Sequence, residues 1–174
     1  MLAILSPAKS LDYESELATR KLSQPQFVSE SSELIQNLRK YDPDQLASLM
    51  RISDKLADLN HRRYLEWAPQ FDRSHARPAA LAFKGDVYLG LDAASLSERD
   101  LNWAQKHIRI LSGLHGLLRP LDGIRPYRLE MGTGLCTKRG KTLYDFWGTK
   151  VTEALNEAIA GQNQKILINL ASNE

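Results

Sequence analysis

The sequence has little of several features that define large protein classes. Its 174 residues include one cysteine, Cys136, which excludes an internal disulfide and any multi-cysteine metal site. The longest apolar runs are short, such as 166–168, whereas a membrane span needs about 20 apolar residues. Lys9 follows the first apolar segment too closely for a signal peptide. We therefore expect a cytoplasmic protein with no membrane partner.

A large excess of charge of one sign is also missing, but the charge is distributed unevenly. The chain carries 23 Lys and Arg against 21 Asp and Glu, and 43% of its residues are hydrophobic, as in soluble globular domains. Residues 104–150 hold 9 basic and 3 acidic residues, a net charge of +6. The segments on either side, 1–103 and 151–174, each carry a net charge of −2. A basic middle segment points to an anionic partner.

Apolar spacing and capping residues predict alternating strands and helices in one domain over residues 1–174. Helices are expected over 29–41, from Asp42-Pro43 to about 50, from Ser53 to 67, over 97–107 and over 142–161. Strands are expected over 2–6, 80–83, 108–111 and 165–170, the last of them buried. The fold class is therefore α/β (mixed α+β), with a central sheet and surrounding helices.

The segment 112–141 stands out because it holds six of the ten glycines of the chain. We expect loops and turns here, and a long loop in a compact domain is usually functional. Gly113 and Gly116 flank Leu114-His115, and their small size would let backbone N–H groups approach a phosphate. Such a glycine hairpin between two helices would form a helix-hairpin-helix-like element. We interpret His115 as a packed or hydrogen-bonded histidine and Cys136 as a small apolar residue.

Three arginines follow the glycine hairpin, and two interpretations of them stay open. Arg119, Arg125 and Arg128 lie within ten residues, interleaved with prolines. Guanidinium groups bind phosphates bidentately, and prolines would hold such a loop rigid for binding. Alternatively, the arginines tie the loop to Asp122, Glu130 and backbone carbonyls.

Two lysines follow predicted strands, where α/β sheets often place ligands. Lys9 comes after the first strand, and Lys84 comes after the second, two residues before Asp86. Each lysine is either a phosphate ligand or a solvated side chain. Tyr88 either stacks on a base or packs in the core.

Seven motifs in this order resemble the bacterial YaaA family of peroxide-stress proteins over residues 1–174. The first three motifs are Ser6-Pro-Ala-Lys9, Met50-Arg-Ile-Ser-Asp-Lys-Leu56 and Phe83-Lys-Gly-Asp-Val-Tyr88. Then come Leu111-Ser-Gly-Leu-His-Gly-Leu-Leu-Arg-Pro-Leu-Asp122, Pro126-Tyr-Arg-Leu-Glu-Met-Gly132, Leu143-Tyr-Asp-Phe-Trp-Gly148 and Asn169-Leu-Ala-Ser172. Family members continue beyond the last motif. We therefore expect this chain to be the N-terminal two-thirds of the full-length domain, with Ser172–Glu174 opening a turn.

The resemblance implies a cytosolic protein that limits free iron during hydrogen peroxide stress and binds DNA through a positively charged cleft. It implies an unusual α/β fold with a helix-hairpin-helix element, and it brings no established catalytic reaction. The candidate DNA- or anion-binding residues are those that fall inside the matched motifs: Lys9, Lys55, Lys84, Gly113, Gly116, Arg119, Arg125 and Arg128. DNA contact would be made through phosphates, with low sequence specificity.

We expect no cofactor and no stable iron site, because the four histidines show no metal-ligand spacing. The alternative function is an enzyme acting on a nucleotide or a phosphorylated small molecule. It would use Lys9, Lys84, Asp86 and the arginine loop as a site at the strand ends.

Overall fold

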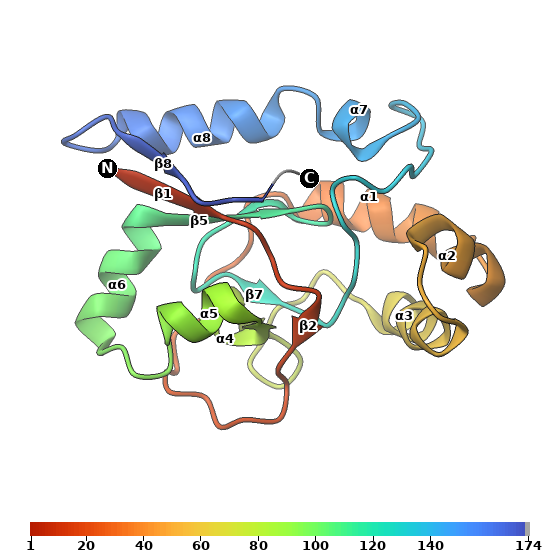
Figure 1. Ribbon diagram of the computed structural model, residues 1–174, viewed down its shortest axis with the longest axis horizontal. Helices are drawn as coiled ribbons and strands as arrows, with labels where there is room; N and C mark the ends of the chain where they lie inside the picture. The colour runs from red at the N-terminus through yellow and green to blue at the C-terminus, as the bar shows by residue number, and fades with distance from the viewer. Residues whose placement is uncertain (173–174) are drawn as a thin grey trace.

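The computed structural model describes residues 1–172, which form helices packed around a small central sheet (Figure 1). The helices are α1 Val28–Leu38, α2 Pro43–Met50, α3 Asp54–Glu66, α4 Ala79–Ala82, α5 Asp86–Leu91, α6 Glu98–His107, α7 Leu143–Trp147 and α8 Lys150–Ala160. The strands are β1 Leu2–Leu5, β2 Ser10–Leu11, β3 Arg77–Pro78, β4 Phe83–Lys84, β5 Ile108–Ser112, β6 Gly116–Leu118, β7 Gly123–Ile124 and β8 Leu167–Asn169. The expected mixed α/β class with a central sheet is confirmed.

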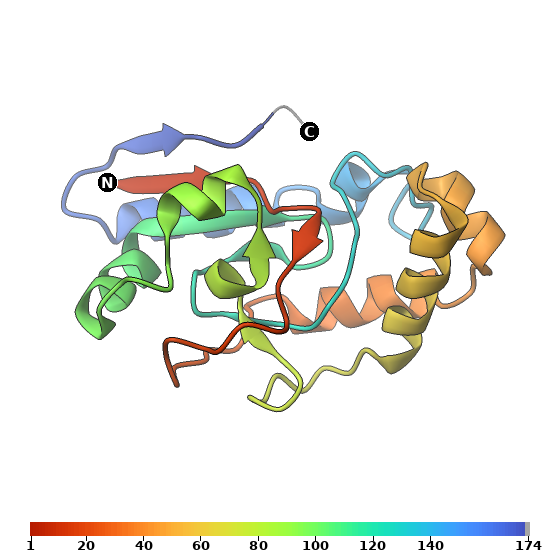
Figure 2. The same ribbon diagram turned by 60° about the horizontal axis from the view of Figure 1, so that its bottom comes forward.

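The central sheet has the strand order β6-β5-β1-β8 and is mixed. β1 lies in the middle and runs parallel to both neighbours, with Ala3 opposite Ile108 on one side and Ile168 on the other. β6 returns antiparallel to β5, with Leu111 opposite Leu117. α8 lies on one face of this sheet, and α5 and α6 lie on the other (Figures 1 and 2). The carboxyl ends of β5, β1 and β8 therefore lie at the same end of the sheet.

Helices with strong local signals begin where the sequence predicts. Asp42 caps α2 through a capping box with Gln45, and Pro43 occupies the first turn. Ser97 caps α6 by accepting a hydrogen bond from the backbone N–H of Asp100. Ser53 stands at the N-cap of α3, although its side chain makes no capping hydrogen bond.

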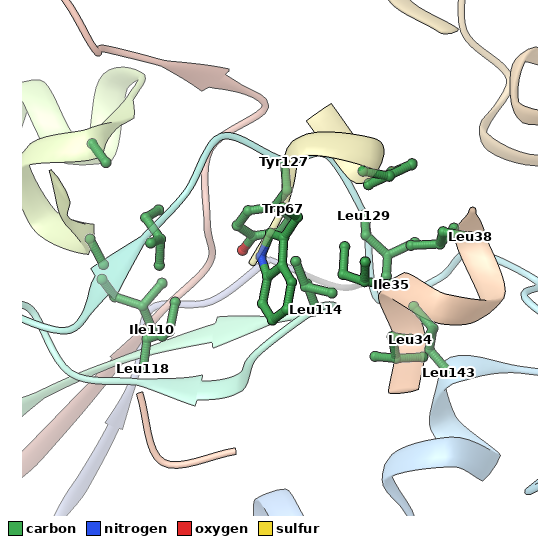
Figure 3. Close-up of a cluster of buried hydrophobic side chains, with 14 of the residues drawn as sticks. Leu34, Ile35, Leu38, Trp67, Ile110, Leu114, Leu118, Tyr127, Leu129 and Leu143 are labelled. Atoms are coloured by element: carbon green, nitrogen blue, oxygen red, sulfur yellow. The ribbon is translucent and has the colours of Figure 1, made fainter. Parts of the chain in front are cut away.

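One buried apolar cluster joins α1 to the hairpin of β5 and β6 and to the segment 127–135. Figure 3 shows the side chains of α1 facing Leu129 and Leu143. The residues of α1, the hairpin and the following segment in this cluster are Leu34, Ile35, Leu38, Ile110, Leu114, Leu118, Tyr127, Leu129 and Leu135. The segment 112–135 thus passes through the core instead of lying on the surface.

Several predicted elements are wrong, and each error has a local cause. The expected strand over 80–83 is the short helix α4 followed by β4, because a short apolar run has no period that separates strand from helix. The expected helix over 142–161 is two helices, because the chain turns at Gly148, where φ is 51°. The segment 112–141, expected to be loops and turns, contains β6 and β7.

The strand expected over 165–170 is present as β8, but the expectation that it is buried is wrong. Four apolar side chains between Ile166 and Leu170 are exposed by 37% to 59%. Within residues 1–172, β8 pairs with β1 alone and forms an edge of the sheet. The turn expected at the chain end includes residues 173 and 174, which lie outside the described residues. Cys136 is exposed rather than packed as a small apolar residue.

The prediction of a helix-hairpin-helix-like element at Gly113 and Gly116 is wrong. Both glycines are buried, and they bracket the turn that joins strands β5 and β6 rather than two helices. Gly116 has a φ of 67°, and a Cβ atom there would lie 2.8 Å from the ring of Trp147. A Cβ atom at Gly113 would collide with the backbone of Leu129. These glycines therefore let the hairpin pack closely against its neighbours.

His115, in the same turn, is a packed and hydrogen-bonded histidine, as expected. It is fully buried, and its Nδ1 lies 3.0 Å from the hydroxyl oxygen of Ser31. Its Nε2 has no hydrogen-bond partner among the described residues. Burial lowers the pKa of His115 to about 3, because the protonated ring would lose its hydration.

This burial predicts that the protein loses stability as the pH falls from about 6.5 toward 4.5. The unfolded state takes up a proton at His115 in this range, whereas the folded state, with a pKa of about 3, does not. Stability therefore rises with pH, by about 1.4 kcal/mol per unit from this residue. Urea unfolding at several pH values should show this slope, and His115→Gln should flatten it. An equal slope in both proteins would contradict the account.

Candidate nucleic-acid interface

Arg119 binds a buried carboxylate rather than pointing freely into solvent. Its Nη2 donates to Oδ1 of Asp122 at 2.8 Å, and its backbone N–H donates to Oδ2 at 2.8 Å. The hydroxyl of Ser23 donates to the same carboxylate. The side chain of Asp122 is 1% exposed, whereas that of Arg119 is 40% exposed. Arg119 therefore neutralises the charge of a buried carboxylate.

Arg125 also braces the loop that carries it. Its Nε donates to the carbonyl of Gln70 at 3.1 Å, and its Nη1 donates to the carbonyl of Glu66 at 3.4 Å. Both carbonyls lie at or just beyond the end of α3. The contacts of Arg119 and Arg125 match the interpretation in which arginines tie the loop to Asp122 and to backbone carbonyls.

Arg128 and Lys9 share the carboxylate of Glu130. Nη2 of Arg128 lies 2.8 Å from Oε1, and Nζ of Lys9 lies 3.3 Å from Oε2. The side chain of Lys9 is 62% exposed, whereas that of Arg128 is 18% exposed. Nε of Arg128 is buried and has no hydrogen-bond partner among the described residues. One carboxylate thus faces two cations, and the lysine remains open to solvent.

Lys84 lies next to this pair because two short strands meet there. β2 and β4 are antiparallel, with Ser10 opposite Lys84, one residue from Lys9. Lys84 is exposed and has no ion pair or hydrogen bond from its side chain within residues 1–172. Tyr88 of the same motif is buried and donates to the carbonyl of Ser6 at 2.8 Å. It is therefore a core tyrosine, and burial raises its pKa far above the usual value.

The turn between α2 and α3 lines a groove that Glu130 also lines. An open groove of about 310 Å³ is lined by Leu49, Met50, Arg51, Glu130, Gly132, Thr133 and Gly134. Arg51 is exposed and has the left-handed backbone conformation, with a φ of 52°. Lys55, in the first turn of α3, is exposed four residues later.

The structure therefore divides the candidate residues into groups. Lys9 and Arg128 pair with Glu130, Arg51 lines a groove with it, and Lys84 lies in the strand beside Lys9. We call these five residues the Glu130 junction. Lys55 lies nearby along α3, whereas Gly113, Gly116, Arg119 and Arg125 serve packing or bracing elsewhere. Sequence reasoning did not select Arg51, although it lies in the same motif as Lys55.

A separate cavity of about 220 Å³ lies at the carboxyl ends of β5 and β1. It is lined by Ser6, Pro7, Leu111, Ser112, Gly113, Met131, Tyr144, Trp147, Gly148, Val151, Thr152 and Ser172. The hydroxyls of Ser6 and Ser172 lie 2.9 Å apart. The described lining holds no charged side chain, so this cavity and the predicted cationic residues are separate features.

The described residues contain no ready-made metal centre and no membrane span. Between residues 1 and 172, no three His, Cys, Asp or Glu side chains gather into a group that could hold a metal ion. No helix in that part of the chain is long and apolar enough to cross a bilayer.

The pairing of Arg119 with Asp122 predicts a loss of stability when the arginine is removed. Arg119→Ala leaves a buried carboxylate with fewer donors, which should lower the free energy of unfolding by about 2–4 kcal/mol. Arg99→Ala, at an exposed position of α6, should change it by less than about 0.5 kcal/mol. Chemical denaturation of both variants measures the difference. Equal stability of the two variants would show that Arg119 does not neutralise Asp122 in the fold.

Comparison with known families gives a match over residues 1–174. The family model described as peroxide stress protein YaaA matches residues 1–174. The match includes the segments that meet at the Glu130 junction and the buried turn of Asp122. The resemblance stated from the motifs is therefore confirmed, and the chain belongs to the peroxide stress protein YaaA family.

Proposed function

We propose that this protein binds DNA through the phosphate backbone at the Glu130 junction, with little dependence on base sequence, as part of protection against peroxide. The observation that carries the proposal is the meeting of four separate motifs around one carboxylate. Lys9 and Arg128 pair with Glu130, and Phe83 and Arg51 line hollows beside it. Lys84 follows Phe83 in β4, next to the segment that carries Lys9.

The charge and exposure of the junction suit phosphate contact. Lys9, Arg51 and Arg128 together with Glu130 carry a net charge of +2, and Lys84 raises the net charge of the junction to +3. Lys84 and Lys55 extend the cationic surface along β4 and α3. Exposed lysines and arginines that neutralise phosphates release counterions, which favours binding to DNA of any sequence. Asn and Gln, which read base edges, are absent from residues 106–141.

The helical pair α2 and α3 is the element of the fold that we assign to the DNA-facing helical hairpin. The two helices pack against each other and are joined by Arg51-Ile52-Ser53. The connection carries Arg51 at its start and is followed by Lys55. The hairpin would thus present both cations on the side of the Glu130 junction.

The small pocket beside Lys9 suits contact with a phosphate backbone better than it suits an enclosed phosphorylated substrate. The pocket between Lys9, Phe83 and Arg128 has a volume of about 20 Å³. A volume of this size holds about one water molecule. A surface of exposed cations over such a shallow pocket fits an extended backbone better than an enclosed substrate.

The proposal includes the limitation of free intracellular iron, which the family resemblance implies. We propose no iron site for it, and the link between DNA contact and iron is indirect in this account. The protein would act on iron without retaining it in stoichiometric amounts.

The central prediction is a loss of DNA affinity without a loss of folding in Lys9→Ala/Lys84→Ala. If four cations contact phosphates, affinity for duplex DNA should fall roughly a hundredfold between 50 and 200 mM salt. The double variant should flatten the slope of log K against log salt by about 2, alike for unrelated sequences. Fluorescence anisotropy measures the affinity, and thermal melting checks the fold.

The matched control is Arg99→Ala/Lys165→Ala, which removes the same charge from exposed positions in α6 and before β8. It should keep a slope within about 0.5 of the unmodified protein. A well-folded Lys9→Ala/Lys84→Ala variant that binds DNA as tightly as the control would move the site away from the junction.

A further inference from the structure

A cationic groove separate from the Glu130 junction lies at the end of the sheet where the parallel strands begin. Figure 1 shows the N-terminus, the end of α6 and the loop after α8 at this end of the molecule. The groove has a volume of about 850 Å³. It is lined by Met1, Trp103, Gln105, Lys106, His107, Arg109, Arg119, Gly161, Gln162, Asn163 and Gln164. None of these residues belongs to the Glu130 junction.

The groove gathers positive charge, and none of its lining residues is acidic. Lys106 is exposed, and its ammonium group has no partner among residues 1–172. Arg109 donates from Nη1 to the carbonyls of Gln105 and Ile108, which leaves its other N–H groups without a partner in the described part of the chain. Burial lowers the pKa of Arg109, the nearby charge of Arg119 lowers it further, and the carboxylate of Asp122 opposes this shift.

An exposed aromatic platform stands beside these cations. Trp103 is 53% exposed, whereas Trp67 and Trp147 are buried. Its ring stacks on His107, with centroids 4.3 Å apart and planes inclined by 23°. Nδ1 of His107 lies 2.8 Å from the carbonyl oxygen of Met1, which holds the histidine ring in place. One face of the indole is supported by this stack, and the exposed area of the ring is available to a flat ligand.

We propose that this groove binds a nucleoside phosphate, with its base stacked on Trp103 and its phosphate held by Lys106 and Arg109. A fixed aromatic ring binds any base through its π face, and a guanidinium or ammonium group beside it binds the phosphate. The amides of Gln162, Asn163 and Gln164 add polar groups that suit the ribose or the base edge. The inference does not depend on duplex binding at the Glu130 junction, because the two sites share no residue.

The nucleoside phosphate is either a free nucleotide or part of an unpaired nucleic-acid strand, and one titration distinguishes the two. Trp103 is the exposed tryptophan, so a stacked base should quench part of the intrinsic fluorescence. AMP should quench saturably, adenosine should bind at least about tenfold more weakly, and inorganic phosphate should compete without quenching. A single-stranded oligoadenylate that binds much more tightly than AMP would identify an unpaired strand as the source. Equal affinity for AMP and for the oligoadenylate would identify the free nucleotide as the source.

Two variants and a control complete the test. Lys106→Ala should weaken AMP binding by about fivefold or more while keeping the quenching signal. Trp103→Ala should weaken binding of AMP, measured by calorimetry, by about tenfold. Lys165→Ala, at an exposed lysine outside the groove, should leave the affinity for AMP unchanged. The proposal is overturned if neither AMP nor the oligonucleotide quenches saturably, or if both variants bind as the unmodified protein does. Unchanged duplex binding by Lys106→Ala would separate this site from the Glu130 junction.

Discussion

The buried carboxylate of Asp122 is the interaction on which much of this fold depends, because distant segments take their positions from its turn. Its side chain accepts hydrogen bonds from Arg119 and from Ser23 of the N-terminal loop. Its carbonyl accepts from Ala79, at the start of α4, and the neighbouring Leu121 N–H donates to Gln105 of α6. A carboxylate with 1% exposure persists only when its charge is paired and its oxygens are hydrogen-bonded. The turn therefore fixes where the chain leaves the core hairpin and enters the segment that ends at Glu130.

This constraint explains why cations that lie close together in the sequence have different roles in space. Arg119 donates hydrogen bonds to the carboxylate, and Arg125 donates hydrogen bonds to backbone carbonyls, so both hold the loop in place. Lys9 lies just before β2 and pairs with Glu130, whereas Lys84 lies in β4 and has no ion pair within residues 1–172. Order in the segment 119–130 places Glu130 where Lys9, Arg128 and the α2–α3 turn meet. In our account, Arg119 and Arg125 stabilise the loop, and the cations of the Glu130 junction bind the phosphates.

The sequence predicted the parts of the fold that depend on neighbouring residues. The capping box of Asp42 and the cap at Ser97 are local, and both helices begin there. The apolar strands β1 and β5 were also found, but their partners were not, because strand pairing joins residues about a hundred positions apart. Gly113 and Gly116 were interpreted as phosphate contacts, since no local signal shows that Leu129 and Trp147 pack on them. The sequence left two interpretations of Arg125 open for the same reason, because its partners are carbonyls more than fifty residues away. Of the site, the sequence supplied the motifs and the residue types, and the fold supplied their convergence on Glu130.

The most direct test of the account is a lysine-reactivity footprint of the folded protein with and without duplex DNA at low salt. Acetylation read by mass spectrometry reports each lysine separately, without any substitution. The account predicts that Lys9, Lys55 and Lys84 lose reactivity several-fold when DNA binds. Lys165, before the edge strand β8, should react equally in both states. Full reactivity of Lys9 and Lys84 in the presence of saturating DNA would contradict the claim that the Glu130 junction is the DNA-binding surface.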